Sequence, residues 1–175
     1  MSGFENLRYF VVGWGDVKDV GKEDFSVFHS SKDYVKYAGD YIYREDYFVL
    51  NKLSYRFGKN INDFEKRINL NSKGRLYRID MDDFGLNFFP MDVLNFNYLE
   101  DINLSFNNIR AISKQIEKLE NLVSIFVESS NLVEIPDEIL KLEKLEYALF
   151  EGNILNKKSR RVLEKLVDFD VDVFY

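Results

Sequence analysis

Cysteine, histidine and long apolar runs are scarce or missing in this chain of 175 residues, and each absence excludes a class of function. There is no cysteine, which excludes disulfides, thiolate catalysis and cysteine-ligated zinc. His29 is the only histidine, so one chain cannot build a multi-histidine metal site. No stretch approaches about 18 consecutive apolar residues, and the N-terminal run has no basic start and is broken at Gly13 and Gly15. We therefore expect a cytoplasmic protein without a membrane span, a secretory signal, a metal or a cofactor.

The balance of charge limits the kinds of partner. The chain has 30 acidic and 24 basic residues, a net charge of −6. A broad nucleic-acid or anionic-membrane surface needs an excess of basic residues, so the composition argues against both. It favours a partner that carries basic residues.

The first 75 residues show short, mixed patterns. Arg8 to Trp14 and Asp24 to His29 are apolar and β-rich, which predicts two short strands. A capping-box pattern at Ser30 predicts a helix to about Tyr43, with a tyrosine stripe on one face. The stripe consists of Tyr34, Tyr37 and Tyr41. Gly13, Gly15 and Gly21 do not form a dinucleotide loop, because Lys18 stands where the fingerprint needs its third glycine.

The segment that follows has alternating and then helical patterns. Asp46 to Phe57 alternates apolar and polar residues with a change of phase near Asn51, which predicts strand structure with a bulge or a turn. Ile61 to Leu70 predicts a weakly amphipathic helix, and Asn71 to Gly74 a turn. Together residues 1–75 are predicted to form a small α+β cap that covers one end of the remaining chain.

The last hundred residues repeat one pattern at a fixed interval. Leucines recur every 23 residues, at Leu76, Leu99, Leu122 and Leu145. Three residues after each of them come Ile79, Ile102, Ile125 and Ala148. A period of this length is typical of a solenoid, in which each unit buries its apolar face against its neighbours.

The repeating unit resembles the leucine-rich repeat family in its 23-residue form. The units read LYRIDMDDFGLNFFP, LEDINLSFNNIRAIS, LVSIFVESSNLVEIP and LEYALFEGNILNKKS. The resemblance implies an α/β solenoid over residues 76–175 with a parallel concave sheet of about five strands. It also implies that Asn107 and Asn153, with Ser130 between them, hydrogen-bond the backbone where each strand ends. Phe84 takes this position in the first unit, so an irregular turn is expected there.

Proline and serine mark the convex side. Pro90 and Pro136 are two periods apart, and Ser113 and Ser159 take the same position in the other units, which predicts four helix starts. Val93, Ile116, Ile139 and Val162 are then expected to face the core. One more period predicts a last helix from Ser159 to Val167 and a terminal strand over residues 168–174. Val171 and Val173 would point inward there, and Asp168, Asp170 and Asp172 would protect the open edge.

The outward positions of the strands define a candidate binding face. Their middle column is predicted to run through Asp80, Asn103, Phe126, Leu149 and Asp172, so that two apolar residues are ringed by carboxylates. The full set of predicted partner-binding residues is Arg78, Asp80, Asp101, Asn103, Phe126, Glu128, Tyr147, Leu149, Glu151 and Asp172.

The resemblance and this face predict a non-enzymatic module that binds a protein or a peptide with basic residues. Three alternatives stay open at this point. The first is a small-ligand-binding or enzymatic N-terminal unit with a pocket of Tyr34, Tyr37, Tyr41 and His29, for which the repeats would serve as scaffold. The second is a bacterial immunity-type inhibitor of a toxin, and the third is a structural protein that acts through self-association.

Overall fold

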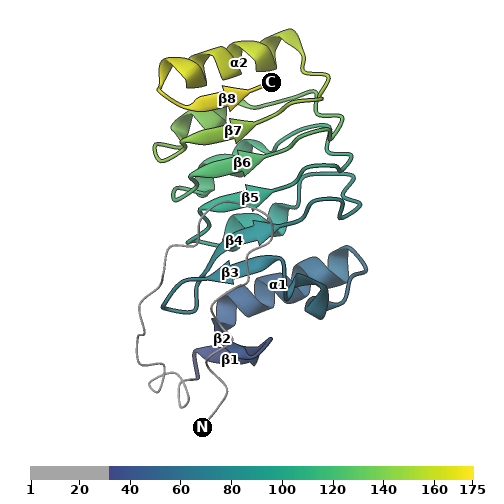
Figure 1. The fold of residues 1–175 in the computed structure, drawn as a ribbon, viewed down its shortest axis with the longest axis vertical. Helices are drawn as coiled ribbons and strands as arrows, with labels where there is room; N and C mark the ends of the chain where they lie inside the picture. The colour runs from purple at the N-terminus through teal and green to yellow at the C-terminus, as the bar shows by residue number, and fades with distance from the viewer. Residues whose placement is uncertain (1–31) are drawn as a thin grey trace.

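A computed structural model describes residues 32–175 of the chain. The strands expected at residues 8–14 and 24–29, together with His29, lie outside the described residues. The described part is built around a six-stranded sheet in the order β3-β4-β5-β6-β7-β8 (Figure 1). Its strands are β3 (Ile68–Leu70), β4 (Leu76–Asp80), β5 (Asp101–Asn103), β6 (Ser124–Phe126), β7 (Tyr147–Leu149) and β8 (Asp172–Phe174).

The register of the sheet reproduces the interval seen in the sequence. β4, β5, β6 and β7 are parallel, and Ile79 pairs with Ile102, Ile102 with Ile125, and Ile125 with Ala148. Each step is 23 residues, so one period of the sequence is one turn of the chain. The architecture is therefore that of a leucine-rich-repeat-like solenoid.

Short 3₁₀ helices cover the other side of the repeats. They are η3 (Met91–Asn95), η4 (Lys114–Lys118) and η5 (Asp137–Lys141). Pro90, Ser113 and Pro136 precede them directly, which confirms three of the four predicted helix starts. The Ser113 hydroxyl accepts a hydrogen bond from the Gln115 N–H at 3.1 Å and so satisfies a donor at the start of its helix.

One continuous hydrophobic core runs through the described part, from Tyr37 in the N-terminal region to Val171 near the C-terminus. The inward residues of the strands and of the 3₁₀ helices contribute to it. Val93, Ile116, Ile139 and Val162 are all buried, as predicted. Burial of such a side chain stabilises the fold by about 1.5–3 kcal/mol, so the repeat ladder provides much of the driving force for folding.

The predicted helix from Ser30 to Tyr43 is wrong, because residues 34–43 form a β-hairpin. β1 (Tyr34–Tyr37) pairs antiparallel with β2 (Asp40–Tyr43). Ala38 and Gly39 turn the chain with φ angles of 52° and 90°, which a right-handed helix does not allow. Gly39 was the sequence signal for this turn, because glycine supplies a positive φ without steric cost.

The predicted strand structure at Asp46 to Phe57 is also wrong, because this segment forms helix α1 (Arg44–Arg56). Its buried residues Asp46, Val49, Leu50 and Leu53 follow helical spacing. Phe48, which the alternating pattern counted as buried, is exposed. The apparent change of phase near Asn51 is the period of a helix.

Residues 61–75 lead into the sheet. The segment predicted as a helix at Ile61 to Leu70 has one 3₁₀ turn, η2 (Ile61–Phe64), and then strand β3, which pairs antiparallel with β4. The turn expected at Asn71 to Gly74 is present. Gly74 has a φ of 66°, and a Cβ there would lie 2.5 Å from the Tyr41 carbonyl oxygen, so this turn requires glycine.

The last turn departs from the 23-residue count. Helix α2 (Lys157–Asp168) confirms the predicted last helix, but it begins after Asn156, two residues before the predicted start at Ser159, and Ala148 pairs with Val173 instead of Val171. An α-helix rises about 1.5 Å per residue against about 2.0 Å in a 3₁₀ helix, so it needs more residues to cover the same length. The strand that follows therefore comes two residues later. Asp168 lies in α2 and Asp170 in a turn, so of the three predicted edge aspartates only Asp172 belongs to the strand.

Candidate functional site

The candidate site is the outer face of the sheet, which we define as the alternate side chains of β4 to β8 that point away from the core, with the residues that directly follow each strand. The register places Arg78, Asp101, Ser124 and Tyr147 in one row. It places Asp80, Asn103, Phe126 and Leu149 in the next row, as the sequence predicts. Asp82, Ser105, Glu128 and Glu151 follow two residues later in each repeat.

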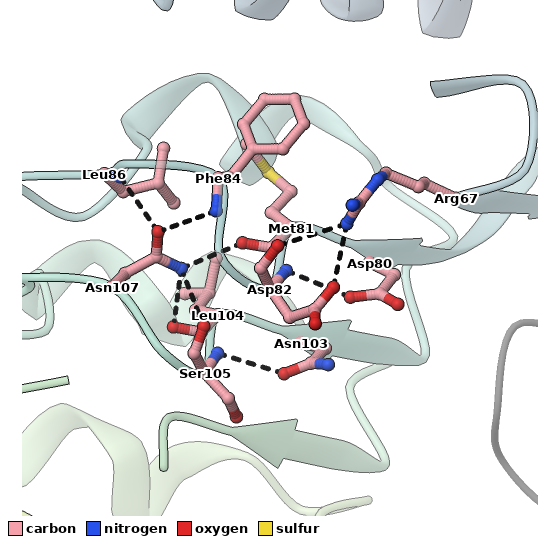
Figure 2. Close-up of polar contacts among 10 residues, drawn as sticks. All are labelled: Arg67, Asp80, Met81, Asp82, Phe84, Leu86, Asn103, Leu104, Ser105 and Asn107. Carbon is pink, nitrogen blue, oxygen red and sulfur yellow. Dashed lines mark hydrogen bonds and ion pairs between the residues drawn. The ribbon is translucent and has the colours of Figure 1, made fainter. Parts of the chain in front are cut away.

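The part of the outer face nearest the N-terminus is bonded within the chain. Arg78 on β4 donates to Oδ2 of Asp101 on β5 through Nε at 3.1 Å and through a terminal nitrogen at 3.0 Å. Arg67, which precedes β3, donates to the Asp82 carboxylate at 2.8 Å and to the Asp82 carbonyl at 3.1 Å (Figure 2). Asp82 and Asp101 therefore each have a basic partner inside the protein.

Side chains also close the backbone at the ends of β4 and β5. Asp80 Oδ1 accepts from the Asp82 N–H, and Asn103 Oδ1 accepts from the Ser105 N–H, both at 3.0 Å (Figure 2). The Ser105 hydroxyl accepts from the Glu128 N–H at 3.1 Å. Asp80, Asn103 and Ser105 are all buried. One oxygen of each side chain is therefore occupied by a bond within the protein.

Asp80 is the outer-face carboxyl with a displaced pKa. Burial raises the pKa of Asp80, and the neighbouring Asp82 carboxylate raises it further. The Asp82 N–H and the Arg67 guanidinium act in the opposite direction but do not cancel these effects. Asp80 and Asp82 therefore behave as a pair in which one negative charge disfavours the other.

The part of the outer face nearest the C-terminus is apolar. Phe126 on β6 pairs with Leu149 on β7, and Leu149 pairs with Phe174 on β8. The prediction that Asp172 ends this column is wrong, since Asp172 pairs with Tyr147. Three successive strands thus present an apolar residue at the same height. Phe174 is 55% exposed and Tyr147 beside the column is 46% exposed.

Carboxylates surround this apolar column. Glu128 follows β6, Glu151 follows β7, and Asp172 lies on β8. Glu151 and Asp172 are exposed and Glu128 is half-buried. Within residues 32–175 the ion pairs of the protein involve none of these three side chains. The C-terminal half of the face therefore has an apolar centre and carboxylates outside these ion pairs. In the N-terminal half, Asp82 and Asp101 are paired with arginines of the same chain.

Asparagine and serine fix the positions where the strands end. Asn107 Oδ1 accepts from the N–H groups of Phe84 and Leu86, and its Nδ2 donates to carbonyls that include Met81 (Figure 2). Asn153 makes the corresponding bonds to Ser130 and Leu132 two turns later. Each amide therefore bonds the turn of the repeat before it, and the outer face rests on a rigid support.

The first turn keeps one left-handed position of the later turns although Phe84 replaces asparagine. Phe84 is buried against Phe64, with ring centroids 5.1 Å apart, and the Lys59 ammonium lies 4.8 Å from the centre of its ring. The residue before it, Asp83, has the same left-handed conformation as its counterparts in the later turns. Gly85 in this turn also has a positive φ, of 74°, which Asn131 shares at 57° but Asn108 in the next turn does not, so the turn differs from its immediate neighbour.

The tyrosine stripe of the N-terminal segment does not form. Tyr34 and Tyr37 lie three residues apart on β1 and so point to opposite sides of the hairpin. Tyr37 is buried, and its hydroxyl donates to the Ile61 carbonyl at 2.6 Å. Tyr34 packs edge-on against Tyr43. These rings serve packing within the hairpin region.

The described residues 32–175 contain neither a metal-ligand cluster nor a helix that could span a membrane. No group of three or more histidine, aspartate or glutamate side chains in residues 32–175 is arranged to hold a metal ion. None of the helices in that range is long and apolar enough to cross a membrane.

Comparisons with known proteins give partial similarities of fold. No family model and no curated protein sequence matches the chain. Among solved structures, a leucine-rich repeat protein of Leptospira interrogans matches at 25% identity over 51% of this chain and 22% of that chain, with a TM-score of 0.47. The leucine-rich repeat ectodomain of the Arabidopsis receptor kinase HAESA, in complex with a peptide hormone, matches at 18% identity over 64% and 25%, with a TM-score of 0.47.

A third similar structure is the plant peptide hormone receptor RGFR1 in complex with RGF2. It matches at 16% identity over 51% of this chain and 13% of that chain, with a TM-score of 0.36. The chain spans a quarter or less of the length of each of these three structures. The site is therefore defined by the repeats and the strand register of this chain itself.

Proposed function

We propose that the protein is a non-enzymatic interaction module that binds a protein or a peptide on the C-terminal half of its outer face. The apolar column of Phe126, Leu149 and Phe174 supports this proposal most strongly, because the register brings the three residues to adjacent strands. An apolar centre with a charged rim is the usual anatomy of a protein interface.

The predicted binding residues divide into those that bond within the protein and those that form the proposed contact surface. Arg78, Asp80, Asp101 and Asn103 act within the protein, since their polar groups bond to one another or to nearby backbone. Phe126, Glu128, Tyr147, Leu149, Glu151 and Asp172 stay in the proposed contact surface, and Phe174 joins them. The surface is smaller than a standard interface of about 20–30 residues a side, so the partner also contacts residues beyond the sheet.

The test compares two double variants in affinity capture. Leu149→Arg with Phe174→Arg places two charges in the apolar column, and it should abolish capture of any partner that the unmodified chain retains. Ile154→Arg with Val167→Arg is the matched control, because both residues are exposed and apolar but lie outside the strands. Circular dichroism and melting temperature confirm that each variant is folded. Equal capture by both double variants would remove this face from the function.

A further inference from the structure

One backbone position takes a left-handed conformation in four successive turns. Asp83, Phe106, Ser129 and Gly152, each 23 residues after the last, have φ angles of 47°, 56°, 47° and 69°. Glycine adopts this region freely and aspartate tolerates it, whereas a bulky side chain is strained there. Phe106 is therefore the least suitable residue of the four for the conformation that the turn imposes.

Packing does not compensate for this strain. The side chain of Phe106 is 54% exposed and does not belong to the hydrophobic core. Among residues 32–175 it takes part in none of the aromatic pairs and none of the cation–π contacts. Its backbone is held by a hydrogen bond of 2.8 Å from its N–H to the Glu128 carbonyl oxygen. A strained and exposed aromatic residue on a rigid turn is typical of a residue kept for binding.

Phe106 follows β5 where that chain end lies beside the end of β6, since its N–H donates to the Glu128 carbonyl oxygen. Glu128 and Glu151 directly precede Ser129 and Gly152, as Ser105 precedes Phe106. Adjacent parallel strands are about 4.8 Å apart, so the ends of β6 and β7 bring Glu128 and Glu151 within reach of one planar cation. Asp82 and Asp101 on the other half of the face are already paired with Arg67 and Arg78.

We propose that the partner contributes an arginine side chain that binds between the Phe106 ring and the carboxylates of Glu128 and Glu151. This inference rests on the proposed function and names the chemistry of the partner. An arginine guanidinium stacks on an aromatic face and donates to two carboxylates at once, and a lysine ammonium does this less well. Its aliphatic stem would cover part of the apolar column, and the net charge of −6 favours the approach of such a partner.

The test selects from a displayed library of random linear peptides against the full chain. Peptides that depend on the outer face are defined as those lost with Leu149→Arg. We expect arginine to be enriched among them and an arginine-to-lysine change in a selected peptide to weaken binding. Glu128→Gln with Glu151→Gln should weaken the same peptides and reduce the dependence of their affinity on salt.

Phe106→Gly separates the binding role from a purely structural one. Relief of the left-handed strain should raise the melting temperature by about 2–4 °C, while loss of the ring should weaken peptide binding about tenfold or more. Ser129→Gly is the matched control, since it relieves the same conformation without removing a ring, and it should bind as the unmodified chain does. Phe106→Asn, which tolerates the left-handed region, gives a second variant without the ring.

Two results would overturn the inference and can be told apart. Peptides that depend on Leu149 but lack arginine, or that bind Phe106→Gly and Phe106→Asn with unchanged affinity, contradict the arginine site and leave the proposed function standing. If no selected peptide depends on Leu149, and Leu149→Arg with Phe174→Arg captures partners as the control double variant does, the proposed function itself is wrong, and the arginine site is wrong with it.

Discussion

The carboxylate of Asp46 on α1 forms a two-pronged ion pair with the guanidinium of Arg75, which directly precedes β4. Arg75 donates through Nε at 2.9 Å and through a terminal nitrogen at 3.0 Å, and the Leu76 N–H donates to the same carboxylate at 2.9 Å. The guanidinium lies between the rings of Tyr43 and Tyr98, 4.3 and 4.5 Å from their centroids. This pair joins the helix of the N-terminal segment to the first strand of the repeats.

Removal of one partner from this pair should be strongly destabilising. The Asp46 side chain is 1% exposed, so Asp46→Ala leaves a cation and the Leu76 N–H without their acceptor, and we expect a loss of about 3–5 kcal/mol. Urea denaturation followed by circular dichroism measures this loss. Asp137→Ala is the matched control, because its ion pair with Lys158 is exposed, and its effect should be much smaller. A loss of under about 1 kcal/mol for Asp46→Ala would contradict the structural role of the pair.

A second prediction concerns the amide of Asn107. Asn107→Ala leaves the buried N–H groups of Phe84 and Leu86 without an acceptor, and we expect it to reduce the free energy of unfolding by about 2–4 kcal/mol. Asn108→Ala removes the same functional group from the next residue, which is exposed, and should change stability by less than about 0.5 kcal/mol. Denaturant unfolding of both variants provides the comparison. Similar losses for the two would show that the amide ladder does not support the strand ends.

The sequence predicted the repeat ladder well because each of its turns is local. The strand, the asparagine position and the start of the 3₁₀ helix recur within each 23-residue unit and contact mainly the same unit or the adjacent one, so the period predicts them all. The N-terminal segment has no such repetition. In that segment the apolar residues fit two patterns. The spacing of Val49, Leu50 and Leu53 fits a helix, whereas an alternating strand pattern would bury Phe48, which is exposed. In the fold, the packing of α1 against η3, η2 and the β1–β2 hairpin accompanies the helical period.

The candidate site was also predicted in part from the sequence. The first four members of the middle column follow from the 23-residue interval, and the register confirms them. The fifth could not follow, because the change from 3₁₀ helix to α2 moves β8 by two residues. The sequence also does not show that Arg67 contacts Asp82. Arg67 precedes β3 and Asp82 follows β4, and the two come together only because β3 pairs antiparallel with β4, where the sequence predicted a helix.

A third prediction follows from the raised pKa of Asp80. A carboxyl whose pKa is higher in the folded protein stabilises the fold most below its unfolded pKa of 3.8, and this contribution is lost as the pH rises through the folded pKa. Asp80→Asn removes the charge that burial and Asp82 disfavour. It should therefore raise the melting temperature at pH 7, and the difference should shrink below pH 3.8.

The next repeat provides a precedent for this change. Asn103 occupies the equivalent position and accepts the equivalent hydrogen bond, so the amide oxygen introduced by Asp80→Asn would keep the bond to the Asp82 N–H. Asp83→Asn serves as the control, because Asp83 is exposed and asparagine tolerates its left-handed backbone. Thermal unfolding across the pH range measures both variants. The expected quantity is the gain in melting temperature of Asp80→Asn over the unmodified chain. A gain that is smaller at pH 7 than at acid pH would contradict the predicted sign.

The last prediction distinguishes the two residues at the start of α2. Asn156 Oδ1 accepts from the Ser159 N–H at 2.8 Å and so caps the helix, whereas the Ser159 hydroxyl accepts from the Ile135 N–H at 2.8 Å and donates to the Val133 carbonyl at 3.1 Å. Asn156→Asp keeps a capping acceptor and adds a negative charge at a helix N-terminus, so stability should be unchanged or slightly higher. Ser159→Asp places a charge in a buried position and should lower the melting temperature sharply. The opposite order would contradict the assignment of Asn156 as the cap of α2 and of Ser159 as a buried bridge to the preceding repeat.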